Sequence, residues 1–387
     1  MASTSLTGNS LTGATSFTIL IGGQAAPDFT ASMVELEVEE NLDMPSAFSL
    51  TVPVNVTSSG DYDTVSDMRL APLSNIAVTA TGGDGQTQCL IDGYVLAQTV
   101  HLTTGAAGST VKVWGQDASW LMNTTEQVKE WADVTDGTVA NSIFGNYGIT
   151  PDESNLDDDS PAHTSDGNTL MQRATDAQFL RRLARRNGKL FRVYCTDTPG
   201  ERTGLFAKPS LDDAPSIVLT LNDADAATVD ALDISWDVMR PSATVAMEAL
   251  FSDSDSSGVG GTTSDSGLDL LEARGLADFA GTTVTSVLTT VVDDGEELTQ
   301  RAESVLIEAG WFVRCQGTAD VNRVGSIMRA GSIAQLNAAG SLHSGNYLVW
   351  SVRHKMTAEK YTMDFVLVRN SVGAAPSAGL LPGGPSL

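Results

Sequence analysis

The chain has 387 residues, 41% of them hydrophobic, which is more than one hydrophobic core usually organises. Its 48 acidic and 22 basic residues give a net charge of −26. A surface this negative repels phosphate backbones, which argues against sequence-specific binding of nucleic acid.

The N-terminal segment 1–16 is rich in Ser, Thr and Gly, and we expect it to be flexible. It lacks the basic and apolar regions of a secretion signal, and no apolar run of the chain is long enough for a membrane helix. We therefore expect a protein that is made in the cytoplasm and does not insert into a membrane.

Short apolar runs separated by turn residues fill the first part of the chain. The segments that read as strands are 16–21, 32–40, 46–54, 74–80, 88–102 and 109–115. Glycine-containing turns such as "GGDG" and "GAAG" separate several of them. The pattern predicts an antiparallel, tube-like β-barrel over residues 17–117.

Residues 118–215 change character and predict an α/β middle domain. In "TVANSIFGNYG" (138–148), apolar residues recur at helical spacing. In the segment that follows, Thr175 is suited to cap a helix, Gln178 to return the bond, and Gly188 to end the helix. The next residues read as a strand.

This middle segment also carries a basic cluster. Seven of the 22 basic residues of the chain lie between Arg173 and Arg192. We take the side chains on the predicted helix as candidate contacts to a neighbouring subunit: Arg181, Arg182, Arg185 and Arg186. The alternative is a solvated helix face whose arginines pair with local carboxylates.

The second half of the chain repeats the strand-rich pattern. Segments 216–250 and 321–370 predict a second barrel, and 251–320 predicts an insertion containing an acidic loop (252–267) and a helix from about Gly295 to Ala309. Residues 371–387 form an uncharged Pro/Gly-rich tail.

An internal repeat supports this division. Residues 75–115 align with 332–369, which places Tyr94 on Tyr347 and His101 on His354. Residues 34–52 align with 232–250, with "PSA" at 45–47 on "PSA" at 241–243. The order of the matches predicts two related barrels. On this alignment His354 lies at a strand end as a structural residue.

No catalytic or metal-binding pattern is present. Motifs for zinc proteases, serine hydrolases and nucleotide loops are missing, and the four histidines are scattered. The three cysteines lack metal-ligand spacing and read as buried free thiols. The loop at 252–267 begins like a calcium loop but has Ser264 where a glutamate belongs. We predict no enzyme activity, no cofactor and no metal.

Three segments together resemble the late control protein D family of contractile phage tails. This family is the tail hub that also forms the N-terminal part of VgrG proteins in type VI secretion. The segments are "VKVWGQDASWLM" (111–122), "TDAQFLRRLARRNGKLFRV" (175–193) and "AGSIAQLNAAGSLHSGNYLVWSVRHKM" (330–356). The resemblance covers the chain from about residue 17 to 370.

The resemblance implies an α+β, mainly β fold: two related antiparallel tube-like β-barrels, an α/β middle domain and a small inserted helical segment. It also implies a homotrimer that adapts a sixfold tail tube hexamer to a trimeric spike protein and surrounds a central channel. The chain would then lie in the virion baseplate, among other baseplate proteins, and DNA would pass without sequence-specific contact.

The chain departs from VgrG proteins because no needle follows the hub-like part, so we expect a separate spike protein. The candidate contacts to the spike are Leu380, Leu381 and Pro382 in the tail. A myophage tail is the favoured setting, with an R-type bacteriocin or another contractile particle as its neighbour.

Two other classes of protein stay open. One is a β-rich glycan-binding or glycan-cleaving tail protein, which would need paired carboxylates and a pocket lined by a tryptophan: Trp114, Trp120, Trp236 or Trp350. The other is a calcium-dependent surface protein that uses the loop at 252–267.

Overall fold

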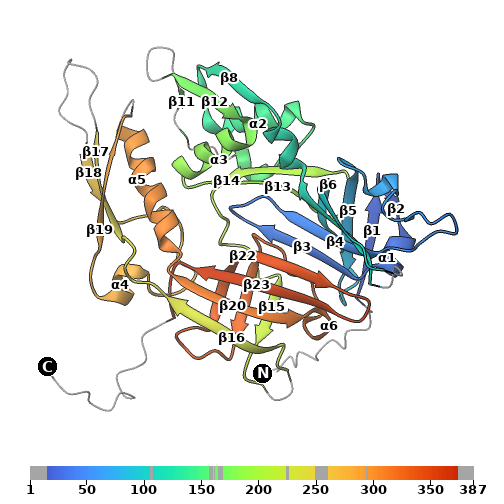
Figure 1. Ribbon diagram of the computed structural model, residues 1–387. Coiled ribbons are helices and arrows are strands. Elements are labelled where there is room, and N and C mark those ends of the chain that lie inside the picture. The colour runs from blue at the N-terminus through green and yellow to red at the C-terminus, as the bar shows by residue number, and fades with distance from the viewer. Residues whose placement is uncertain are drawn as a thin grey trace.

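A 13-stranded, mainly antiparallel sheet forms the body of the molecule, and two smaller units are attached to it (Figure 1). The computed structural model describes residues 15–104, 108–156, 160, 162–163, 169–223, 226–248, 260–292 and 295–373. Within these ranges the prediction of a mainly β protein is confirmed.

The first half of the large sheet comes from the N-terminal part of the chain. Its elements are β1 (Ser16–Ile21), β2 (Gln24–Ala25), α1 (Pro27–Ser32), β3 (Glu35–Asn41), β4 (Ala47–Pro53), η1 (Met68–Leu70), β5 (Asn75–Thr81), β6 (Thr87–His101) and β7 (Thr110–Asp117). The strands alternate buried and exposed residues because one face packs on the core. We call β1 and β3–β7 the first unit.

The second half comes from the C-terminal part. Its elements are β15 (Ile217–Thr220), β16 (Val229–Trp236), β20 (Val313–Asp320), α6 (Val321–Val324), β21 (Ile333–Asn337), β22 (Gly345–Met356) and β23 (Tyr361–Arg369). We call β15, β16 and β20–β23 the second unit. Its α6 is a single short turn of helix at the end of β20.

The two units have the same topology. In space the first unit runs β3-β4-β7-β6-β5-β1, and the second runs β16-β20-β23-β22-β21-β15. Strands at the same position in the two units also follow one another in the same order along the chain: β1, β3, β4, β5, β6 and β7 correspond to β15, β16, β20, β21, β22 and β23. The one difference is that β1 pairs antiparallel with β5, whereas β15 pairs parallel with β21. The structure therefore contains two copies of one strand arrangement.

The units join through strands β3 and β22. These strands pair antiparallel from Asn41 opposite Ser351 to Leu36 opposite Met356. One hydrophobic core runs behind both units, from Ile19 in β1 to Leu367 in β23. The pairing makes the two units one continuous sheet.

The middle unit follows β7. It contains η2 (Ala118–Asn123), β8 (Glu126–Trp131), β9 (Val134–Thr135), α2 (Asp136–Asn146), β10 (Thr150–Pro151), η3 (Glu153–Leu156), β11 (Ala162–His163), β12 (Leu170–Thr175), α3 (Asp176–Arg186), β13 (Leu190–Cys195) and β14 (Arg202–Ala207). The hydroxyl of Thr175 accepts a bond from the Gln178 N–H at 3.3 Å, and Gly188 has φ +64° after the helix. The predicted start and end of α3 are confirmed.

The inserted unit lies between β16 and β20. It contains β17 (Ala243–Glu248), β18 (Gly260–Thr263), α4 (Leu276–Ala280), β19 (Thr285–Thr290) and α5 (Gly295–Gly310). Its sheet has the order β18-β17-β19, and Leu298 and Ala302 of α5 pack on Ala246 of β17. Figure 1 shows α5 lying along this sheet, with one end beside the large sheet.

Two predicted boundaries of the insertion were wrong. Residues 243–248 belong to the inserted sheet rather than to the second barrel, and residues 313–320 are a strand of the large sheet rather than part of the insertion. The insertion therefore spans 237–312. The match of 45–47 with 241–243 is also wrong, because the strand in the second unit equivalent to β4 is β20.

A bulge in each unit corrects the repeat alignment by one residue. The β6–β7 ladder shifts between Val95 and Ala97, and the β22–β23 ladder shifts between Val349 and Ser351. Superposing the two bulges places His354 on Val100, not on His101. Val100 and His101 are both exposed whereas His354 is buried, because β3 pairs alongside β22 at His354 and no strand takes that place beside the end of β6 in the described residues.

Candidate assembly surfaces

A buried ionic cluster lies at the joint of the two units. The carboxylate of Glu40 in β3 is fully buried and accepts bonds from Arg192 at 2.8 Å and from Arg329 at 2.6 Å. The N–H of Ala330 donates to the same carboxylate at 3.1 Å. Glu40 thus connects the first unit to the middle unit through Arg192 and to the second unit through Arg329.

The charges of this cluster support one another. Burial alone would raise the pKa of Glu40, but the guanidinium groups of Arg329 and Arg192 outweigh burial, so the pKa lies below its ordinary value. Arg329 also donates to the carbonyl of Cys195 in β13 at 3.0 Å. The cluster therefore keeps its charges at neutral pH and fixes three parts of the chain to one another.

His354 belongs to this cluster as a neutral structural residue. It is fully buried, its Nδ1 lies 3.0 Å from the hydroxyl of Tyr361, and its Nε2 lies 3.9 Å from the Glu40 carboxylate. Burial lowers the pKa of His354 to about 4; the Glu40 charge opposes this shift and the Arg329 charge adds to it. This environment suits a neutral imidazole at physiological pH.

We expect His354 to make the fold sensitive to acid. Because its pKa falls from 6.5 to about 4 on folding, its contribution to stability is complete above pH 6.5 and is lost as pH falls through about 4. The full loss corresponds to about 3 kcal/mol. Urea unfolding of the wild type and of His354→Gln between pH 7 and pH 4 checks this. The variant, which cannot titrate, should lose less stability over that window; parallel curves would contradict the expectation.

Of the four candidate arginines, two are paired within the chain. Arg185 donates to Asp43 at 2.7 Å, and Arg186 donates to Asp136 at 2.6 Å. The first pair connects α3 to the turn between β3 and β4. These pairs agree with the alternative that the helix arginines pair with carboxylates of the same chain. They do not test contacts to another subunit.

The other two arginines differ in exposure. Arg181 is partly buried, with its guanidinium 5.7 Å from the centroid of the Phe191 ring, and burial lowers its pKa. Arg182 is exposed and makes no ion pair among the residues that the structure describes. Arg182 is therefore the member of the set most available to a neighbour, and its role in subunit contact stays a prediction.

The exposed face of the large sheet carries balanced charge near the joint. A groove of about 730 Å³ crosses β3, β22, β23, β20 and β16. Within and beside it Arg353 pairs with Glu39 at 2.6 Å, and Lys355 pairs with Asp364 at 2.7 Å. The acidic surplus of the chain is thus not concentrated on this part of the sheet.

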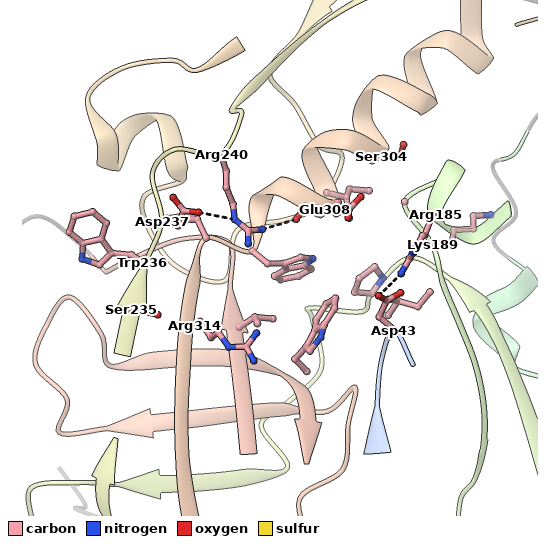
Figure 2. A pocket seen from close by; sticks show the side chains of 18 residues that line it. Asp43, Arg185, Lys189, Ser235, Trp236, Asp237, Arg240, Ser304, Glu308 and Arg314 are labelled. Carbon is pink, nitrogen blue, oxygen red and sulfur yellow. Dashed lines mark hydrogen bonds and ion pairs between the residues drawn. The ribbon is translucent and has the colours of Figure 1, made fainter. Parts of the chain in front are cut away.

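An aromatic cavity of about 370 Å³ lies where α3, α5 and the second unit meet. Trp311 and Trp350 line it, with their ring centroids 6.3 Å apart. Figure 2 shows Arg240 between Asp237 and Glu308 on one side and the Arg185–Asp43 pair on the other, with Trp236 at the outer end. Two of the tryptophans named from the sequence, Trp236 and Trp350, therefore share one cavity.

The other two named tryptophans lie elsewhere. Trp114 is exposed on β7, and Trp120 packs against Tyr94 with ring centroids 6.2 Å apart. The glycan hypothesis thus keeps part of its expected geometry. In the cavity, however, Asp237 and Asp43 already face arginines at 3.6 and 2.7 Å.

Several sequence predictions fall outside the described residues. These include the tail contacts Leu380, Leu381 and Pro382 and residues 252–259 of the possible calcium loop. In the described ranges no cluster of His, Cys, Asp or Glu is arranged to hold a metal ion, and the three cysteines are buried. No helix in those ranges combines the length and the apolar character needed to cross a membrane.

The sequence match to a protein family extends over most of the chain. A family model described as "Alg8 N-terminal domain" matches residues 12–358. The chain belongs to this family. No match was found among curated protein sequences.

Solved structures show the same fold in tail proteins. The 43 kDa tail protein of prophage MuSo2 from Shewanella oneidensis is 14% identical with a TM-score of 0.61, covering 92% of this chain and 99% of that one. A tail protein from Neisseria meningitidis MC58 is 13% identical with a TM-score of 0.65, covering 92% and 97%. A type VI secretion component from E. coli, described as similar to T4 phage tail proteins, is 12% identical with a TM-score of 0.54, covering 93% and 79%.

These structures confirm the resemblance to the tail hub family at the level of the fold. At 12–14% identity they carry no information on individual side chains. The chain therefore shares its fold with these tail proteins.

Proposed function

We propose that this chain is a non-enzymatic structural hub in the baseplate of a contractile tail or injection machine. Three copies would form a ring around a central channel and would connect a sixfold tail tube to a threefold spike. The tail-protein fold supports this role. The proposal also includes assembly in the host cytoplasm and a place in the finished virion.

The observation that carries the proposal is the duplicated strand order. Two units with the same six-strand topology lie side by side in one sheet. Three such chains supply six nearly equivalent units, so a ring with threefold symmetry offers six similar contacts to a sixfold partner. A single barrel, or two unrelated ones, would not provide this match.

The insertions leave one end of the ring available for the tail tube. Strands β7 and β16 run in the same direction, and the middle and inserted units follow their ends at Asp117 and Trp236. At the opposite end the chain passes from β6 to β7 and from β22 to β23, at equivalent places in the two units. We propose that this second end receives the tube and that the tail residues Leu380, Leu381 and Pro382 contact the spike.

The balanced groove on the sheet suits a channel wall. Two of its cations, Arg323 and Arg353, pair with carboxylates at 2.8 and 2.6 Å, which reduces the positive charge that it offers to a DNA backbone. Under this proposal passing DNA would make no sequence-specific contact.

Mass measurement and electron microscopy test the proposal. Purified protein should have the mass of three chains, and with tail-tube protein it should form threefold rings stacked on sixfold discs. A monomer at all concentrations, with no binding to tube discs, would overturn the proposed role.

A second function rests on the aromatic cavity. The cavity would suit a sugar, which could stack on the indole rings of Trp236, Trp311 and Trp350. Asp237 and Glu308 also line the cavity. This candidate is the weaker one because Asp237 already pairs with Arg240 at 3.6 Å. A glycan array and a cell-wall hydrolysis assay separate the two functions, because the hub proposal expects no signal in either.

A further inference from the structure

Besides the outer edges of β2 and β15, two longer strand edges of the large sheet pair with no strand among the described residues. One is the outer edge of β16, which pairs only with β20. The other is the edge of β6 beyond Ala97, which pairs only with β7, because β5 pairs with β6 no further than Tyr94. Unpaired edges expose backbone donors and acceptors that another strand satisfies.

These edges are the equivalents of the two strands that join the units. In the repeated order β16 corresponds to β3, and β6 corresponds to β22. Within one chain β3 and β22 pair with each other. We propose that β16 of one copy adds antiparallel to the end of β6 of the next copy and so repeats the internal joint between chains. This inference specifies the subunit contact of the proposed ring and rests on that function.

The ladders fix the register of this contact. The matched bulges place Arg353 on Thr99 and Met356 on Leu102. The same bulges place Val352 on Gln98. From Gln98 the paired residues across β7 and β4 lead to Leu36 in β3. From Val352 the paired residues across β23 and β20 lead to Leu232 in β16, so Leu36 corresponds to Leu232.

The internal pairs then translate directly. Arg353 lies opposite Glu39, and Met356 lies opposite Leu36. Between copies Thr99 therefore faces Ser235, and Leu102 faces Leu232. The intervening positions follow in the same order: Gln98 with Trp236, Val100 with Ile234, and His101 with Asp233.

Exposed apolar side chains occur at these positions. Trp236 is 51% exposed, Leu102 46% and Val100 37%, whereas their counterparts at the internal joint, Glu40, Met356 and His354, are fully buried. In the proposed register all three would point to the core side of the sheet, beside Ile234 and Leu232. Covering them with the next copy removes apolar surface from water, as the internal joint already does.

The chemistry of the two joints differs. The internal joint is ionic because Glu40 meets Arg192 and Arg329. At the equivalent position between copies stands Trp236, so the outer joint is mainly apolar. On the opposite face His101 would lie next to Asp233 of the other copy.

The partner must be another copy of this chain. Each copy carries one free β16 edge and one free β6 edge, and the two are complementary rather than identical. Head-to-tail contacts of this kind form a ring where the rotation closes. The β3–β22 joint already shows that strands of these two types fit together.

Cysteine cross-linking tests the register. Residues directly opposite in an antiparallel pair have Cα atoms about 4.5–5.5 Å apart, which a disulfide spans. A chain with Thr99→Cys and Ser235→Cys should therefore form covalent dimers and trimers under mild oxidation. The matched control is Ala97→Cys with Asp233→Cys, which is four residues out of register and about 13 Å apart along the strand. The three native cysteines are buried, so oxidation of the wild type measures the cross-linking that does not come from the introduced cysteines.

A second variant tests the contact without oxidation. Val100→Asp should shift the mass from three chains to one, because it would bury an unpaired carboxylate at the joint. Val128→Asp is the control, since Val128 is 80% exposed on β8 of the middle unit. Circular dichroism and thermal unfolding of each variant show whether it folds.

The outcomes separate this inference from the proposed function. Trimers that cross-link in register and dissociate with Val100→Asp support both. Trimers that cross-link equally in the control, or not at all, overturn the strand pairing and leave the hub in place. A wild-type protein that is monomeric and does not cross-link overturns both.

Discussion

Replacing Glu40 with alanine is expected to lower the free energy of unfolding by about 3–5 kcal/mol. The substitution leaves Arg192 and Arg329 at the joint without their shared carboxylate, and the side chain of Arg192 is only 6% exposed. A buried charge without a partner costs far more than the pair itself contributes. Denaturant unfolding measured by tryptophan fluorescence gives this difference.

The neighbouring residue provides the control. Glu39 pairs with Arg353 at 2.6 Å, but both side chains are more than two-fifths exposed. An exposed pair contributes less than about 1 kcal/mol, so Glu39→Ala should change stability little. Equal losses for the two variants would show that the buried cluster does not hold the joint.

The sequence predicted individual strands well because their signal is local. The pattern "VELEVEE" alternates side chains with a period of two, and β3 lies there as expected. The same alternation places Glu40 on the face of Leu36 and Val38, which marks it as a charge that points to the core. The alternation in the sequence thus identifies Glu40 as a buried charge.

The partners of Glu40 could not be read in the same way. Arg192 is 152 residues away and Arg329 is 289 residues away. Alternation tells which face a residue occupies but does not tell which strand lies beside it. For the same reason residues 216–250 were all assigned to the second barrel, although residues 243–248 pair with β18 and β19 in the inserted sheet.

Compensating substitutions also conceal the repeat. Phe48 lies opposite Gly115 in the first unit, and Cys315 lies opposite Leu367 at the equivalent place in the second. In the first unit the large side chain of Phe48 on β4 faces a glycine on β7. In the second unit the small side chain of Cys315 on β20 faces the large side chain of Leu367 on β23. The combined side-chain volume of the pair is similar in the two units, although both residue types differ. A sequence alignment therefore shows no similarity at this pair.

Gly115→Leu is therefore expected to destabilise the first unit by about 3 kcal/mol, the upper end of the usual cost of overpacking. A Cβ at residue 115 would lie 2.3 Å from the Phe48 ring and 2.3 Å from the carbonyl oxygen of Tyr94. Gly145→Ala is the control, because nothing lies within 4 Å of its added Cβ in α2. That change should be neutral or stabilise the protein by up to about 1 kcal/mol.

The double variant tests whether the two units solve one packing problem in two ways. Phe48→Cys alone should cost about 3 kcal/mol, because it leaves a cavity in the core. Combined with Gly115→Leu it recreates the Cys–Leu pair of the second unit, so the total loss should fall below the sum of the single losses by about 1–3 kcal/mol. The carbonyl of Tyr94 does not move out of the way with Phe48, so the rescue should be partial. Strictly additive losses in denaturant unfolding would mean that the two units do not share this packing, although they share the order of their strands.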